Sequence, residues 1–137
     1  MKMLKNPIYL AILAACLFEV LVYTGFCFKQ FRYISDEEKI KIAIEYVLKE
    51  NRETIIEYKE KATFYPFNTV DEFLAHKPIS CEASNTLRGG LDWIEKISGN
   101  LSSYVILEFM GIYKGMPKKA HRLIAITNCG FAWNPLD

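Results

Sequence analysis

The hydrophobic residues divide the chain into an apolar N-terminal run and a longer remainder of mixed polarity. The run extends from Ile8 to Phe28, and its single charge is Glu19. As an α-helix it would rise about 31 Å, roughly the thickness of the hydrocarbon layer of a bilayer. Basic residues flank the run on both sides: Lys2, Lys5, Lys29 and Arg32. The pattern predicts an uncleaved signal-anchor that crosses the membrane once.

Two other interpretations of this run stay open. Leu13-Ala14-Ala15-Cys16 is similar to the lipobox of bacterial lipoproteins, although the residues after Cys16 remain apolar. The run also has the composition of a buried helix of a soluble protein, but such helices seldom continue so far without polar residues. For an anchor, the short N-terminal tail with its two lysines favours a cytoplasmic N-terminus and an extracytoplasmic C-terminal part. The basic residues after the run argue for the opposite orientation.

One face of the predicted membrane helix carries small residues and a carboxyl group. Ala11, Ala15, Glu19 and Tyr23 recur every four residues, and Cys16 lies beside them. Small residues allow a second helix to approach closely, and a carboxyl group within the bilayer usually faces protein. We therefore predict that these five residues dock on a partner membrane helix or on a second copy of the chain. The alternative is a neutral carboxyl group that faces lipid.

Residues 29–34 form a short basic and aromatic stretch after the apolar run. Its aromatic side chains are typical of the membrane interface, and Lys29 and Arg32 are placed to contact lipid phosphates. Simple anchoring is the plainer interpretation. Ser35 and Glu38 then have the spacing of a capping box, which predicts the start of an amphipathic helix. This helix is expected over residues 36 to about 50, with a weaker pattern toward residue 61.

The C-terminal half predicts a β-hairpin. Residues 102–113 and 121–129 are rich in β-branched and aromatic residues, and residues 114–120 are expected to be the loop. A third strand is expected from Phe64–Phe67 or from the tail. Between helix and hairpin, Asn68 or Thr69 is expected to cap a short helix that ends before Pro78. Residues 79–90 are expected to be loop, and residues 91–97 a short turn or helix.

These elements predict an α+β fold. It has a single N-terminal transmembrane helix, a long amphipathic helix and a small antiparallel sheet built on a C-terminal hairpin. Residues 1–34 form the membrane anchor with its flanks, and residues 35–137 form a small soluble α+β domain. An aromatic content of 14% argues against disorder in this domain.

Charge and cysteines narrow the chemistry. The formal net charge is +1, so the chain lacks the basic excess of a nucleic-acid-binding domain. Cys81 and Cys129 are the cysteines outside the apolar run, and we predict a disulfide between them on the oxidising side of a membrane. With His76 and His121 they match no usual zinc spacing, so we predict no metal site. Motif searches find no catalytic signature, and we predict neither enzymatic activity nor a cofactor.

The C-terminal half contains Asp71, Glu72 and Phe73, then Pro78 and Cys81, and finally Asn128, Cys129, Gly130 and Trp133. In these residues the segment 65–133 resembles small, uncharacterised bacterial membrane-anchored proteins. The resemblance implies a membrane anchor and no particular activity. The order of helix, sheet and cysteines is also similar in architecture to type IV pilins and pseudopilins. The chain lacks their processing site, because no glycine precedes the apolar run.

Together these patterns predict a non-enzymatic, single-pass protein of the bacterial inner membrane with a periplasmic domain. It is expected to dock on a larger membrane protein complex and to modulate or complete it. Its expected partners are an integral membrane protein or a second copy, and the lipid bilayer, but not nucleic acid. The alternatives are a phage- or plasmid-type exclusion or immunity protein at the inner membrane, and a pseudopilin-like assembly subunit.

Overall fold

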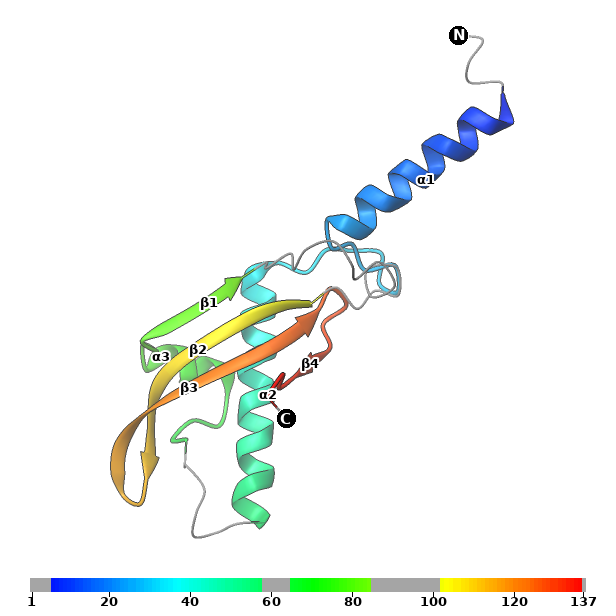
Figure 1. Ribbon diagram of the computed structural model, residues 1–137. Helices are drawn as coiled ribbons and strands as arrows, with labels where there is room; N and C mark the ends of the chain where they lie inside the picture. The colour runs from blue at the N-terminus through cyan, green and yellow to red at the C-terminus, as the bar shows by residue number, and fades with distance from the viewer. Residues whose placement is uncertain (1–5, 58–64, 85–101, 137) are drawn as a thin grey trace.

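The computed structural model describes residues 6–57, 65–84 and 102–136. Within these residues, three helices and four strands follow one another: α1 (Pro7–Tyr23), α2 (Asp36–Glu57), α3 (Val70–Ala75), β1 (Ser80–Ser84), β2 (Ser102–Tyr113), β3 (Met116–Thr127) and β4 (Ala132–Trp133). The strands pair antiparallel in the order β1-β2-β3-β4 (Figure 1). The α+β arrangement of helices with a small antiparallel sheet is therefore present.

The prediction of a transmembrane helix is wrong. Helix α1 has 17 residues and ends at Tyr23. Gly25 adopts a positive φ of 81°, the amide of Phe26 donates to the carbonyl of Leu21, and the amide of Gly25 donates to the carbonyl of Val22. These two bonds form a Schellman motif, which terminates the helix before the apolar run ends. Within the described residues, no helix is both long enough and apolar enough to cross a membrane.

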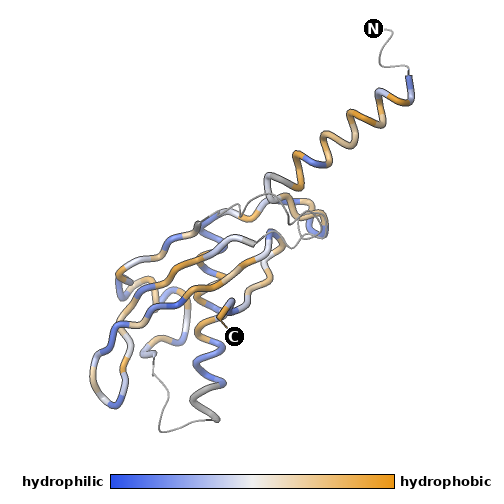
Figure 2. The backbone as a smooth tube through the Cα atoms, viewed as in Figure 1, coloured by the Kyte–Doolittle hydropathy of each residue, from blue (hydrophilic) through white to orange (hydrophobic). Residues whose placement is uncertain are grey.

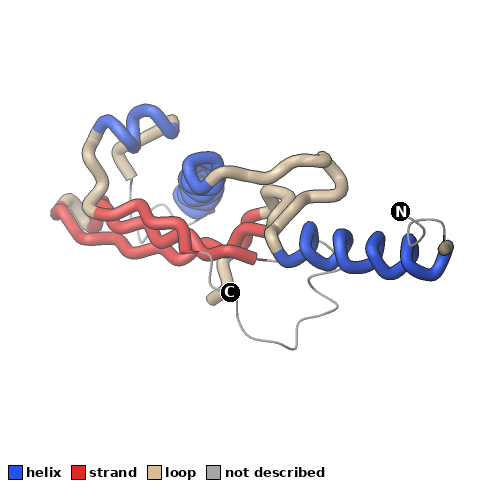
Figure 3. The backbone as a smooth tube through the Cα atoms, turned by 90° about the horizontal axis from the view of Figure 1, so that it is seen from above, coloured by secondary structure: helices blue, strands red, loops and turns tan. Residues whose placement is uncertain are grey.

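Helix α2 covers one face of the sheet, and α3 lies over the same face (Figure 3). The capping box is confirmed, since the amide of Glu38 donates to Ser35 Oγ at 3.2 Å. Helix α2 is longer than its clearest sequence pattern and reaches Glu57. Its buried residues pack on the inward-facing residues of β2 and β3, and the two sets form the core: Ala43, Ile44, Val47, Leu48, Val105, Leu107, Phe109, Ile124 and Ile126.

Four aromatic side chains close the α3 end of this core. Phe73 of α3 packs edge to face on Phe109 of β2 with ring centroids 4.9 Å apart, and Tyr65 packs on Phe109 at the same distance. Phe67 contacts Phe73 at 5.2 Å. The predicted cap of α3 is confirmed, because Thr69 Oγ1 accepts from the amide of Glu72. The aromatic segment around Pro66 is thus core rather than strand in its described part.

The hairpin is confirmed, but its loop is shorter than expected. Strands β2 and β3 continue to Tyr113 and from Met116, so only Lys114 and Gly115 form the turn. Both have positive φ, at 50° and 76°, as a two-residue type I′ turn requires. The tail supplies an expected further strand, β4. Strand β1 lies in a segment expected to be loop, and residues 91–97 lie outside the described residues.

Candidate docking surface

Helix α1 projects from the rest of the fold, and most of its residues are hydrophobic (Figures 1 and 2). None of the other described helices and strands contacts it. Val22 near the end of the helix is buried, whereas eight of its large apolar residues each expose between 43% and 65% of their surface: Ile8, Tyr9, Leu10, Ile12, Leu13, Leu17, Phe18 and Val20. Full burial of such a side chain is worth about 1.5–3 kcal/mol, so their half-exposure leaves roughly 6–12 kcal/mol available to an apolar partner.

The residues predicted to bind a partner all belong to α1. Ala11, Ala15, Cys16 and Glu19 are exposed, and Tyr23 is the last residue of the helix. At 3.6 residues per turn, the five positions fall within an arc of about 140°. The opposite side carries bulkier residues: Leu10, Leu13 and Leu17. The helix thus brings the predicted positions onto one side, and no other described helix or strand contacts it there.

An aromatic segment joins α1 to α2. We call residues 24–34 the collar. Phe26 packs against Phe28 and Tyr33 with ring centroids 5.2 and 5.1 Å apart, and Phe28 reaches back to Phe18 of α1 at 5.0 Å. The hydroxyl groups of Thr24 and Tyr33 lie 3.1 Å apart. The collar therefore continues the apolar surface of α1 toward the sheet.

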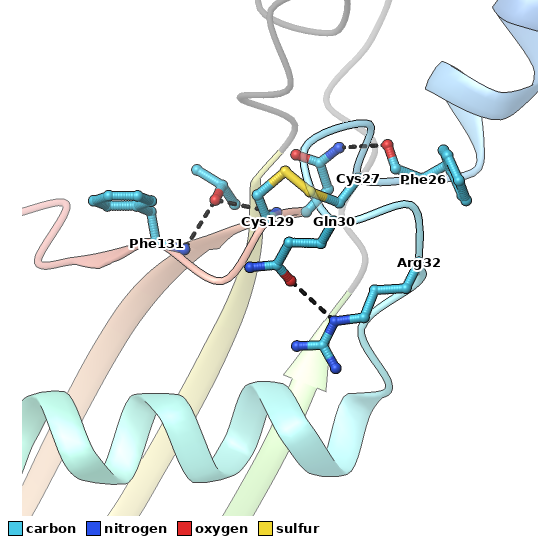
Figure 4. Close-up of a disulfide and its surroundings, with 8 residues drawn as sticks. Phe26, Cys27, Gln30, Arg32, Cys129 and Phe131 are labelled. Atoms are coloured by element: carbon cyan, nitrogen blue, oxygen red, sulfur yellow. Dashed lines mark hydrogen bonds between the residues drawn. A yellow bond between two sulfur atoms is a disulfide. The ribbon is translucent and has the colours of Figure 1, made fainter.

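A disulfide between Cys27 and Cys129 fastens the collar to the end of β3 (Figure 4). Beside it, Asn128 Nδ2 donates to the carbonyl of Phe26 at 2.9 Å. Arg32 donates to Gln30 through Nε and forms an ion pair with Glu38 of α2 at 2.7 Å. The base of α1 is thereby held on the sheet by one covalent bond and on α2 by one ion pair.

The predicted Cys81–Cys129 disulfide is wrong. Cys81 is a free thiol on β1, paired in register with Leu107, whereas Cys129 follows the end of β3 that pairs with Ser102. Five residues along a strand span about 17 Å, and a disulfide needs Cα atoms within about 7 Å. Burial raises the pKa of the Cys81 thiol. In the sequence, Cys27 belongs to the apolar run. Gly25 stops the helix two residues earlier, and this glycine is the sequence signal that Cys27 lies outside the helix.

The remaining candidates for chemistry are a metal site and a catalytic cavity. Among the described residues there is no cluster of three or more His, Cys, Asp or Glu side chains suited to a metal ion. A cavity of about 250 Å³ lies between α3 and β2 and is lined mainly by apolar side chains. His76 and Lys77 are the titratable residues of its lining, and His76 Nδ1 donates to the carbonyl of Glu72 at 2.8 Å. The described lining contains no serine, threonine or cysteine.

Comparison with known proteins adds no relative. No protein-family model matches the chain, and neither a curated protein nor a solved structure is significantly similar to it.

Proposed function

We propose that this protein is a non-enzymatic accessory protein that docks on a larger membrane protein complex and modulates or completes it. The docking element is α1, and its contact face consists of Ala11, Ala15, Cys16, Glu19 and Tyr23. The partner surface is an apolar helix of an integral membrane protein, which the small residues allow to approach closely. The Glu19 carboxyl group hydrogen-bonds across this contact.

The exposure of α1 is the observation that carries this proposal. A helix with eight half-exposed large apolar side chains is unfavourable in water, whereas the core beneath α2 is closed without it. Contiguous apolar surface on this scale is typical of sites for protein or membrane partners. The apolar partner is therefore expected in or at a membrane.

The Cys27–Cys129 disulfide supports a location for the folded part on the oxidising side of that membrane. Disulfides form and persist outside the cytoplasm, and thiols inside it are kept reduced. Our proposal therefore places the sheet and α2 on the extracytoplasmic side of the bacterial inner membrane.

Cys16 provides the means to test the proposal. Its thiol is exposed on the proposed face, whereas the thiol of Cys81 is partly buried. A photoreactive thiol reagent on Cys16 is expected to crosslink the chain to one partner in native membranes. In a matched control, Cys16→Ser combined with Leu17→Cys moves the thiol by about 100° around the helix, and the crosslink should disappear.

Bulk added to either side of α1 gives a second test. Ala15→Phe should abolish co-purification of the partner, and Leu17→Phe on the opposite side should retain it. Glu19→Leu should weaken co-purification because it removes the hydrogen bond across the contact. Equal crosslinking from positions 16 and 17, or crosslinks only to a second copy of the chain, would overturn docking on a larger complex.

A further inference from the structure

The collar contains a turn that exposes an aromatic side chain. Cys27 and Arg32 pair as an isolated β-bridge, with amide-to-carbonyl distances of 3.0 and 3.4 Å, and four residues connect them. Phe31, the last of the four, has a φ of 50° and is 78% exposed. The left-handed region favours glycine and asparagine and is unfavourable for a bulky side chain.

The fold offers little compensation for this conformation of Phe31. Its ring touches Phe26 with centroids 6.4 Å apart and otherwise stands in solvent. The turn is held in place by the Cys27–Cys129 disulfide and by the ion pair of Arg32 with Glu38. A strained residue that the surroundings hold in place points to a role for its side chain outside the fold.

The charged and aromatic side chains around the turn are those typical of a membrane surface. Arg32 is neutralised by Glu38, whereas Lys29 is exposed on the turn. Tyr33, half exposed, follows the turn with its hydroxyl group near that of Thr24. Aromatic rings beside a lysine are typical of the membrane–water interface. Because Phe31 on this turn is 78% exposed, its ring is accessible to a deformable lipid layer.

We propose that the collar turn enters the headgroup layer of a lipid bilayer, with Phe31 at the acyl boundary and Lys29 on an anionic lipid phosphate. This inference rests on the membrane location proposed above and does not depend on the identity of the protein partner. It assigns the turn to lipid and the small-residue face of α1 to protein. Phe28 of the collar packs on Phe18 of α1, so the turn and the docking helix are neighbours.

A tryptophan reporter at position 31 tests the contact directly. The background is full-length protein in which both native tryptophans are replaced, Trp93→Phe and Trp133→Phe. In this background, Phe31→Trp is compared with the control Met116→Trp. Met116 is similarly exposed and follows the β2–β3 turn, at the far end of the fold from α1 (Figure 1). The probe is vesicles of phosphatidylcholine and phosphatidylglycerol with brominated acyl chains. We expect a blue shift and at least twofold quenching (an estimate from interfacial burial of aromatic rings) at position 31, and neither at position 116. Absence of quenching at position 31, or equal quenching at both, would overturn the proposal.

Two substitutions separate lipid contact from a structural role. Phe31→Asn suits a positive φ, so the melting temperature should hold or rise while vesicle affinity falls about tenfold. Lys29→Gln should lower affinity about fivefold on anionic vesicles and leave neutral vesicles unchanged. A lower melting temperature with unchanged vesicle affinity would show that Phe31 is structural only. Crosslinking from Cys16 needs no vesicles, so docking of α1 and lipid contact of the collar can fail separately.

Discussion

Removal of the Cys27–Cys129 disulfide should have the largest effect on stability of any change outside the core. The bond joins residues 102 positions apart, so it closes a loop that contains α2, α3 and most of the sheet. In the chain-entropy model a loop of about 100 residues is worth about 4.7 kcal/mol. Small domains are stable by about 5–15 kcal/mol in total. The Cys27→Ala/Cys129→Ala double variant is therefore expected to lose a third or more of the free energy of unfolding.

Urea denaturation followed by circular dichroism measures this loss. With an m-value of about 2 kcal/mol/M, the midpoint of the double variant should fall by about 2 M. The m-value should also rise, because the unfolded chain is no longer crosslinked and exposes more surface. Cys81→Ala is the matched control. It removes a partly buried thiol without releasing any loop and should cost about 1 kcal/mol or less.

The collar gives this prediction a local readout. Lys29 and Arg32 are trypsin sites within the segment that the disulfide fastens. Cleavage there should be faster in the double variant, because only hydrogen bonds and the ion pair to Glu38 remain. A loss below about 1 kcal/mol, or a non-reducing peptide map that links Cys81 to Cys129, would refute the reasoning.

Three further experiments probe single residues and their contacts. Gly130→Ala should cost about 1 kcal/mol more than Gly115→Ala in thermal unfolding, because both have positive φ but only the methyl group at 130 would meet side chains, the nearest at 3.3 Å. The hydrogen bond from Lys119 lowers the pKa of Glu108, so Lys119→Met should raise that pKa, as NMR titration of the carboxyl group would report. The stabilisation from this pair is present at neutral pH and is lost as acid protonates Glu108. Because burial raises the pKa of Cys81, iodoacetamide should modify it slowly at pH 8 and faster as the pH rises, as mass spectrometry would show.

Elements with local signals were predictable from the sequence. The capping box at Ser35 and the apolar stripe that follows it specify α2, and Thr69 specifies the start of α3. The alternating residues of β2 and β3 specify a hairpin because each strand can be recognised alone. The predicted loop, residues 114–120, is too long. Lys114 is not one of the residues that usually signal a positive φ, so the two-residue turn was not recognised.

Features that depend on distant contacts were not predictable in the same way. Strand β1 has a sequence of small and polar residues, and it is a strand because β2 offers it an edge. The partner of Cys129 depends on which end of the sheet the collar reaches, and residue spacing contains no such information. The end of α1, in contrast, has a local signal in the sequence that the prediction missed. Gly25 followed by an aromatic residue fits a Schellman motif.

The disulfide and the docking proposal are connected through preorganisation. A helix on a free linker would lose orientational freedom on binding, and this loss would weaken the complex. The collar removes part of that cost in advance, because Cys27 is bonded to Cys129 only four residues after α1 ends and Arg32 is paired with Glu38. Reduction of the disulfide should therefore weaken partner binding even where the sheet stays folded. The same bond that stabilises the domain would then also limit the directions in which α1 can meet the proposed partner.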